Sequence, residues 1–279
     1  MQDEPNLTDT LALMRDLRAR CEWDRAQTHA SLRPYLIEEA HEVDDAIRRE
    51  DDVALREELG DLLLQVVFHS VVAHERGAFD LAGVAESLIT KMRDRHPHLY
   101  PPAGAEAPVT RPSWEGMKAR ARTGGIDRGL PPTLPALHRA HRLQDRAAGV
   151  GFDWPNAEGP AGKVAEELGE VRELLGPDYA RADAGAGPEG AAHFARVEDE
   201  LGDLLFAAVN LCRQAGVHAS LALDRANAKF TRRFNAVERL AAARGIDVAT
   251  AGIEVLDPLW DEVKHDERRA ESVGPAASA

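Results

Sequence analysis

The chain has 279 residues, 44% of them hydrophobic and 29% charged, and this composition excludes a disordered protein and supplies enough apolar side chains for a core. Only 5% of the residues are aromatic, and Ala, Leu, Glu and Arg are abundant, so we expect an all-α protein. The net charge of −14 argues against a nucleic-acid polymer as partner, because phosphate backbones bind to basic surfaces, whereas a small phosphorylated ligand carried by a divalent cation stays compatible.

The cysteines and the N-terminal residues indicate the compartment. Cys21 and Cys212 lie in different halves of the chain and imply no disulfide framework, as is usual in a reducing cytosol. The N-terminal residues contain neither the basic nor the apolar region of a secretion signal. The longest apolar run, at 62–68, is far shorter than the ~20 residues that span a bilayer. We therefore expect a cytoplasmic protein without a membrane partner.

In the first part of the chain, hydrophobic residues recur at helical spacing. They predict helices over 8–21, 34–49, 53–77 and 81–96. The helix over 53–77 has a wide apolar face, which is typical of a helix buried in a bundle. Glu58 and Asp61 interrupt this face one turn apart, so two acidic groups are expected at a core-facing position.

A segment rich in proline and glycine follows, over residues 100–133, and is expected to be a linker with a short helix at 114–122. The order of helical patterns then repeats. We therefore predict one helical domain over 1–99 and a second over 134–265.

The second part of the chain predicts four helices, a last apolar segment and two segments without regular structure. The helices are expected over 134–148, 162–175, 194–215 and 221–244. The apolar segment over 255–263 is expected to pack back onto the second domain. Residues 176–192 are rich in Gly, Ala, Asp and Pro and lack apolar periodicity, so we expect a mobile insertion there. Residues 266–279 are expected to form a disordered tail.

Two sets of carboxylates occur in the same order in the two halves. An EExxE string on one helix is followed by ExxD on the next, which gives Glu38, Glu39, Glu42, Glu58 and Asp61 in the first half and Glu166, Glu167, Glu170, Glu200 and Asp203 in the second. At this spacing the side chains can converge between two packed helices. Crowded like charges are costly to bury unless a cation neutralises them, and Mg²⁺ prefers oxygen ligands. All ten acids are therefore candidate ligands of Mg²⁺, for which Mn²⁺ is a substitute.

Two other interpretations of the acids stay open. A solvated, Glu-rich helix face would explain one set, but it explains less well a repeated set that interrupts an apolar stripe. A di-iron bundle uses Glu-x-x-His on paired helices, and Glu38 and His41 have that spacing. However, Gly169 stands at the position of His41 in the second half, and the partner helices carry Asp61 and Asp203 instead of His.

The two acid motifs and their flanking strings resemble the tandem-domain MazG nucleoside triphosphate pyrophosphohydrolases. The likeness covers residues 8–264 and includes ELGDLLLQVVF at 58–68, ELGDLLFAAVNL at 200–211, RHPH at 95–98, VGFDW at 150–154 and ANxKFxRRF at 226–234. The resemblance implies two MazG-like helical domains, each of which pairs across a homodimer into four-helix-bundle-like units. It also implies Mg²⁺-dependent hydrolysis of nucleoside triphosphates to the monophosphate and pyrophosphate, in house-cleaning or stress-related control of nucleotide pools.

The resemblance also implies substrate contacts. Lys229 and Arg233, which are i, i+4 on one predicted helix, match positions that contact phosphates in the family, and Lys163 is a further match. Asn227 and Trp260 match positions near the nucleotide. The substrate-binding residues are therefore expected to be Lys163, Asn227, Lys229, Arg233 and Trp260.

Catalysis is expected mainly in the second half, with metal binding in both. The first half keeps its acids and has Lys91 and Arg95 at the i, i+4 spacing of Lys229 and Arg233, but its helix is ended by His96-Pro97. The catalytic residues are expected to be Glu167, as the base that orients water, with Glu170, Lys229 and Arg233. The alternative function is a non-catalytic, metal-binding regulatory or interaction module.

Overall fold

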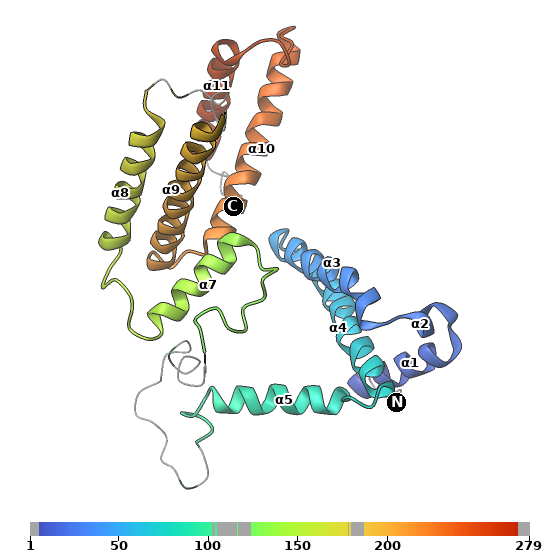
Figure 1. The fold of residues 1–279 in the computed structure, drawn as a ribbon. Helices are drawn as coiled ribbons and strands as arrows, with labels where there is room; N and C mark the ends of the chain where they lie inside the picture. The colour runs from blue at the N-terminus through green and yellow to red at the C-terminus, as the bar shows by residue number, and fades with distance from the viewer. Residues whose placement is uncertain are drawn as a thin grey trace. The chain divides into compact units, whose positions relative to one another are not determined.

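The computed structural model confirms the all-α prediction. It describes residues 6–101, 124–177 and 187–272, with residues 104, 116 and 179 in isolation. Within these ranges the regular secondary structure consists of helices without strands (Figure 1), and none of these helices combines the length and the apolar character that crossing a membrane requires. The chain divides into two compact units, Met1–Arg111 and Pro112–Ala279, and the division falls inside the expected linker.

Five helices make up the described part of the first unit: α1 Leu7–Arg20, α2 Glu22–Ala26, α3 His29–Arg48, α4 Asp52–Glu75 and α5 Leu81–Asp94. Four of them match the predicted helices, and α2 was not predicted. Helix α3 begins at His29 rather than at Pro34, because the Thr28 side chain accepts the backbone N–H of Ser31 and the Ser31 side chain accepts that of Thr28.

The core of the first unit lies where α1 and α3 pack against α4. Its buried residues are Met14, Leu32, Val67, Phe68, Val71 and Val72. The four that lie on α4 are spaced by three and four residues between successive turns, as helical periodicity requires. The packing fixes α3 beside α4, and these two helices carry the first set of acids.

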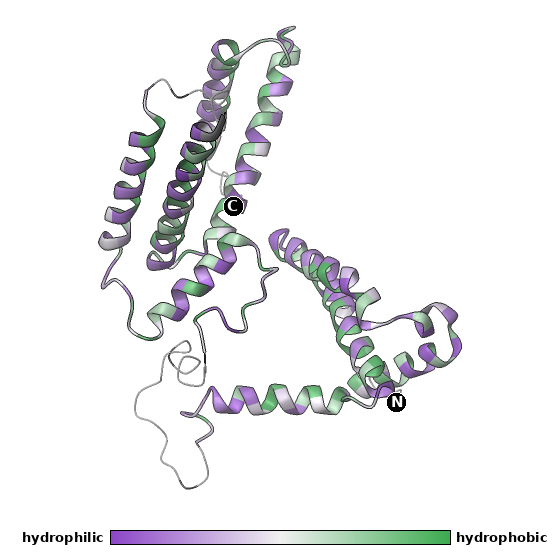
Figure 2. Cartoon of the chain, in the orientation of Figure 1, coloured by the Kyte–Doolittle hydropathy of each residue, from purple (hydrophilic) through white to green (hydrophobic). Residues whose placement is uncertain are grey.

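Five helices also make up the described part of the second unit: α7 Ala136–Ala148, α8 Glu158–Leu175, α9 Gly187–Gln214, α10 Ala219–Ala243 and α11 Ile253–Ser272. Helices α8 and α9 lie side by side, and α10 pairs with α11 (Figure 1). Val237, Ala241 and Leu259 form the buried contact of the second pair. Hydrophobic and hydrophilic residues alternate along each helix, which leaves one face for packing (Figure 2).

The described residues differ from the expectation in two segments. Helix α9 begins at Gly187, so residues 187–192 of the expected insertion are helical; proline is tolerated in a first turn and alanine favours the helix, which fits Pro188 and the alanines after it. Helix α11 continues to Ser272, into the expected tail. The short helix expected at 114–122 lies outside the described residues, except for Gly116.

Candidate metal centres

Three carboxylates of the second unit meet between α8 and α9. One oxygen atom from each of Glu167, Glu170 and Glu200 lies within 4.8 Å of the others. Glu167 is 4% exposed, whereas Glu170 is exposed and Glu200 is half-buried. Three like charges at this separation repel one another, and a hard divalent cation with oxygen ligands would remove the repulsion. The donor set therefore fits the ion predicted from the sequence.

Neighbouring groups change the acidity of this cluster. The hydrogen bond with Glu200 raises the pKa of Glu170, and burial and the charges of Glu200 and Glu167 raise it further. Lys163 offsets part of the negative charge, because its Nζ atom lies 2.6 Å from Glu167 and 2.9 Å from Glu166. The hydrogen bond to Glu167, followed by that to Glu166, raises the pKa of Lys163, so its ammonium group stays charged at neutral pH.

The first unit contains a similar cluster between α3 and α4. Oxygen atoms of Glu39, Glu42 and Glu58 lie within 4.8 Å of one another. Burial raises the pKa of Glu39, and the charges of Asp61, Glu42 and Glu38 raise it further. Desolvation followed by the charges of Glu42 and Asp61 raises the pKa of Glu58. Both units thus concentrate negative charge at the same place in their helix pairs.

Six of the ten predicted ligands come together in these two clusters. The other four are Glu38, Asp61, Glu166 and Asp203, whose oxygens do not belong to the two groups that converge within the described residues. Asp61 and Glu38 still act on Glu39 through their charge, and Glu166 is bound to Lys163. Asp203 is exposed on α9, one turn after Glu200. Metal ligation by these four residues stays a prediction.

The predicted phosphate-binding residues lie on α10. Lys229 and Asn227 are exposed there, and the Nε atom of Arg233 donates to Glu267 of α11 at 2.7 Å. The Arg233 guanidinium lies 6.0 Å from the centroid of the Trp260 ring. The α10–α11 pair therefore holds Arg233 in place.

Glu267 was not predicted as a functional residue, because its segment was expected to form a disordered tail. Its Oε1 atom also accepts from Arg232 Nε at 3.2 Å. A signal was present in the sequence: positions 260, 264 and 267 follow the i, i+4, i+7 pattern of one helix face. The run of Glu, Arg and Ala around Glu267 also favours a helix.

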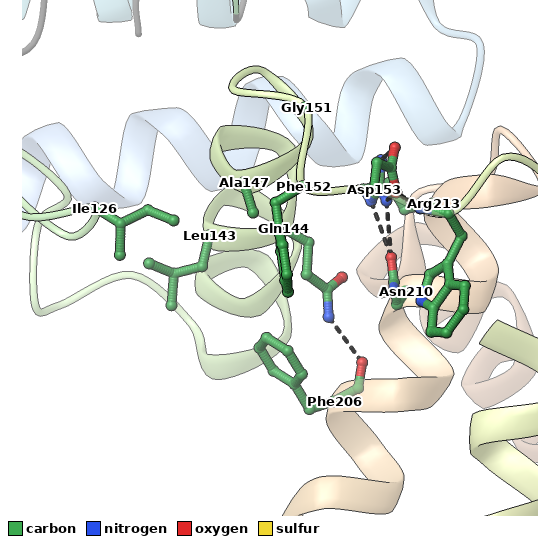
Figure 3. A pocket seen from close by; sticks show the side chains of 11 residues that line it. Ile126, Leu143, Gln144, Ala147, Gly151, Phe152, Asp153, Phe206, Asn210 and Arg213 are labelled. Atoms are coloured by element: carbon green, nitrogen blue, oxygen red, sulfur yellow. Dashed lines mark hydrogen bonds and ion pairs between the residues drawn. The ribbon is translucent and has the colours of Figure 1, made fainter. Parts of the chain in front are cut away.

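A cavity of about 560 Å³ lies between α7 and α9 of the second unit (Figure 3). The Nε2 atom of Gln144 donates to the backbone carbonyl of Phe206 at 2.8 Å, which orients the buried amide. Arg213 binds Asp153, with 3.0 Å between Nη1 and Oδ2. The hydrogen bond from Arg213 is the main cause of the lowered pKa of Asp153. Phe152 is 83% exposed at the mouth.

Helix α9 contributes to both the cavity and the acid cluster, but from different sides. Phe206 follows Glu200 by six residues, so it lies roughly 9 Å further along the helix axis and about 120° around it. The cavity and the cluster are therefore separate features of the second unit.

The sequence is similar to known proteins along almost its whole length. The profile of the MazG nucleotide pyrophosphohydrolase domain matches residues 27–100. A protein of Escherichia coli strain K12 named nucleoside triphosphate pyrophosphohydrolase is 40% identical over 273 residues, 96% of this chain and 99% of that protein. A Thermotoga maritima protein named nucleoside triphosphate pyrophosphohydrolase/pyrophosphatase MazG is 40% identical over 265 residues, 92% of this chain and 94% of that protein. The profile match includes the first acid cluster.

Proposed function

The chain belongs to the MazG family of nucleotide pyrophosphohydrolases, and on this premise we propose that it hydrolyses nucleoside triphosphates to the monophosphate and pyrophosphate in a Mg²⁺-dependent reaction. The observation that carries the proposal is the convergence of Glu167, Glu170 and Glu200 within 4.8 Å. The protein is thus a nucleoside triphosphate pyrophosphohydrolase with an all-α fold. Catalysis takes place mainly in the second unit, and the first unit also binds metal.

The acid cluster supplies the ligands. Glu167, Glu170 and Glu200 would hold Mg²⁺, with Glu166 and Asp203 completing the set, and Mn²⁺ would substitute for it. When bound, the metal offsets the charge of the phosphates and lowers the pKa of a water molecule. Glu167 is buried at the centre of the cluster and serves as the base that orients this water.

Cationic side chains bind the phosphates. Lys163 contacts Glu167 of the cluster and the neighbouring Glu166, so it would place a positive charge beside the metal ligands, where it could bind a phosphate oxygen. Lys229 and Arg233 contribute further positive charge from α10, at the i, i+4 spacing of one helix face. Trp260 and Asn227 would contact the nucleoside, a role that their match to family positions near the nucleotide supports. The cavity between α7 and α9 would offer a second space for the nucleoside.

Two features of the described residues support a homodimer that works in the cytoplasm. Large apolar side chains are exposed on the α8–α9 pair, at Leu168, Phe194, Leu201, Leu205 and Phe206. Their burial against a second copy would form the four-helix unit of a homodimer. Two half-buried free cysteines fit a reducing cytoplasm. The enzyme would there control nucleotide pools, as house-cleaning or in response to stress.

A direct assay tests the proposed reaction. The purified protein is incubated with mixed nucleoside triphosphates and Mg²⁺, and pyrophosphate and monophosphates are measured. Release of orthophosphate and diphosphates without pyrophosphate would exclude it. Tight capture of a partner protein without turnover under Mg²⁺ or Mn²⁺ would favour the non-catalytic module.

A further inference from the structure

The last turns of α11 place one carboxylate against two adjacent arginines of α10. Glu267 Oε2 accepts from Arg233 Nε at 2.7 Å, and Glu267 Oε1 accepts from Arg232 Nε at 3.2 Å. Neighbouring residues of a helix point about 100° apart, so adjacent side chains do not normally face each other. Glu267 contacts both arginines at once, one with each of its carboxylate oxygens.

The contact leaves a defined part of each guanidinium for another anion. A guanidinium is a planar fork with five N–H donors, and its Nε edge is distinct from the edge formed by the two terminal nitrogens. Glu267 binds the Nε atom of both arginines, so it occupies the Nε edge of each guanidinium. The same contacts fix the orientation of the edge that carries the two terminal nitrogens. Phosphate oxygens match the terminal edge in a bidentate geometry.

A second contact restricts Arg233. The side chains of Arg233 and Glu267 are each 22% exposed, and the guanidinium also faces the ring of Trp260 at 6.0 Å. Phe230 packs against the same ring, with 5.3 Å between the ring centroids. Arg233 is thus held at one edge and on one face, and little rotational freedom remains to be lost when an anion binds.

The charges favour a polyanion. Arg232, Arg233 and Lys229 place three positive groups within two turns of α10, and Glu267 neutralises one of them. The remainder is a net charge of about +2 at neutral pH, because unperturbed Arg and Lys are protonated and Glu is ionised there. The second unit thus carries both a basic site on α10 and the acid cluster at Glu167. A phosphate chain would bind the basic site directly and the acid cluster only through a cation.

We propose that Glu267 is a positioning residue for the reaction, which orients Arg232 and Arg233 as a paired clamp for the phosphate chain of the substrate. This inference rests on the proposed function. It extends the active site to the C-terminal turns of α11. Glu267 itself does not touch the substrate: it acts through the two arginines.

The same helix pair supplies a matched control. Glu262 of α11 accepts at 2.7 Å from Arg244, the residue that caps the C-terminal end of α10, so it links the same helix pair through the same kinds of group. If Glu267 only fastened α11 to α10, Glu267→Gln and Glu262→Gln would have similar effects.

The first experiment compares KM and kcat for a nucleoside triphosphate under Mg²⁺ in wild type, Glu267→Gln, Glu267→Asp and Glu262→Gln. We expect Glu267→Gln to raise KM about tenfold, because a charge-assisted contact is lost, and to leave kcat within about twofold. Glu267→Asp should recover part of the loss, and Glu262→Gln should keep the wild-type KM. An unchanged KM in Glu267→Gln, or an equal rise in Glu262→Gln at a similar thermal midpoint, overturns the inference.

A second experiment separates this inference from the proposed reaction. Binding of inorganic pyrophosphate in the presence of Mg²⁺ is measured by calorimetry, and Glu267→Gln should weaken it about tenfold in wild type but not in the Arg233→Gln background. If the wild type releases no pyrophosphate from triphosphates yet binds pyrophosphate in a Glu267-dependent way, the reaction is wrong and the clamp stands. If wild type and Glu267→Gln bind pyrophosphate equally, or neither binds it, the clamp is wrong.

Discussion

Lys163 Nζ lies 2.6 Å from the buried carboxylate of Glu167, one turn further along α8. An i, i+4 ion pair stabilises a helix more when the acid precedes the base, and here the order is reversed. The pair is therefore better explained by the acid cluster than by helix stability. Lys163 supplies the positive charge that Glu167 needs while it is surrounded by Glu170 and Glu200.

Replacing Lys163 tests this role. In Lys163→Met, we expect the apparent affinity for Mg²⁺ to rise, because a competing cation is gone, and KM for a nucleoside triphosphate to rise roughly tenfold, because a phosphate contact is lost. Titration calorimetry and steady-state kinetics measure the two effects. Arg20→Met is the control, since Arg20 pairs with Asp16 on the exposed side of α1. A fall in both Mg²⁺ affinity and KM would contradict the assignment.

The acid clusters predict unequal effects of mutation in the two units. Glu167→Ala with Glu170→Ala should lower kcat at least about a hundredfold, because the metal ligands and the general base are lost together. Circular dichroism should show the same helix content as wild type. Glu39→Ala with Glu42→Ala should cost far less activity. A greater loss from the first-unit pair would reverse the assignment of the principal catalytic unit.

Metal binding should appear as thermal stabilisation. A ligand that binds only the folded state at a hundred times its Kd stabilises by about 2.7 kcal/mol. We therefore expect Mg²⁺ to raise the thermal midpoint of wild type, with smaller rises when either acid cluster is removed and none when both are. Scanning fluorimetry with Mg²⁺, Mn²⁺ and chelator measures this. Equal rises in wild type and in the variant lacking both clusters would place the ion elsewhere.

The Asp153–Arg213 pair predicts a pH dependence of stability. The hydrogen bond from Arg213 lowers the pKa of Asp153 in the folded state, so its contribution is fully present above the unfolded pKa, near pH 4, and is lost as pH falls through the folded pKa below that value. Asp153→Asn should cost about 1 kcal/mol at pH 7, a small figure because the pair is partly screened by solvent. Urea unfolding at pH 7 and near pH 2 should show this difference shrinking in acid.

The cavity between α7 and α9 predicts a nucleoside contact. Phe206→Ala removes an apolar wall and should raise KM for nucleoside triphosphates severalfold while Mg²⁺ affinity stays unchanged. Phe194→Ala is the control, because Phe194 is similarly exposed on the same helix but does not line the cavity. Sedimentation of both variants separates the two roles of Phe206: a dissociated dimer with unchanged KM would assign Phe206 to the subunit interface instead.

Sequence periodicity predicted the helices well because each amphipathic pattern is local. Spacing alone also put Glu167 and Glu170 on one face. It could not decide which acids of the neighbouring helix would meet them, because the rotation and register of α9 against α8 depend on packing between distant residues. Thus Glu200 joins the cluster, whereas the oxygens of Asp203, one turn away, do not.

Two helix boundaries also differ from the prediction: the end of α11 and the start of α3. Residues around Glu267 show high charge and little apolar content, which predicted a disordered tail although their helix propensity is high. The contacts with α10 that hold this helix involve residues distant in the sequence, so local spacing could not reveal them. The capping box at Thr28 is a local motif that the sequence contains. However, Pro34 also favours a helix start, and the helix was predicted to begin there instead.

The unequal exposure of Glu167 and Glu170 has a consequence for the proposed metal site. An arriving cation would meet the exposed Glu170 first, since Glu167 is 4% exposed and held by Lys163. We therefore expect replacement of Glu170 to slow capture of the ion, whereas Glu167 has to exchange its contact with Lys163 for the ion. Exchange kinetics of the metal would respond to these two positions separately, even where their effects on equilibrium occupancy are alike.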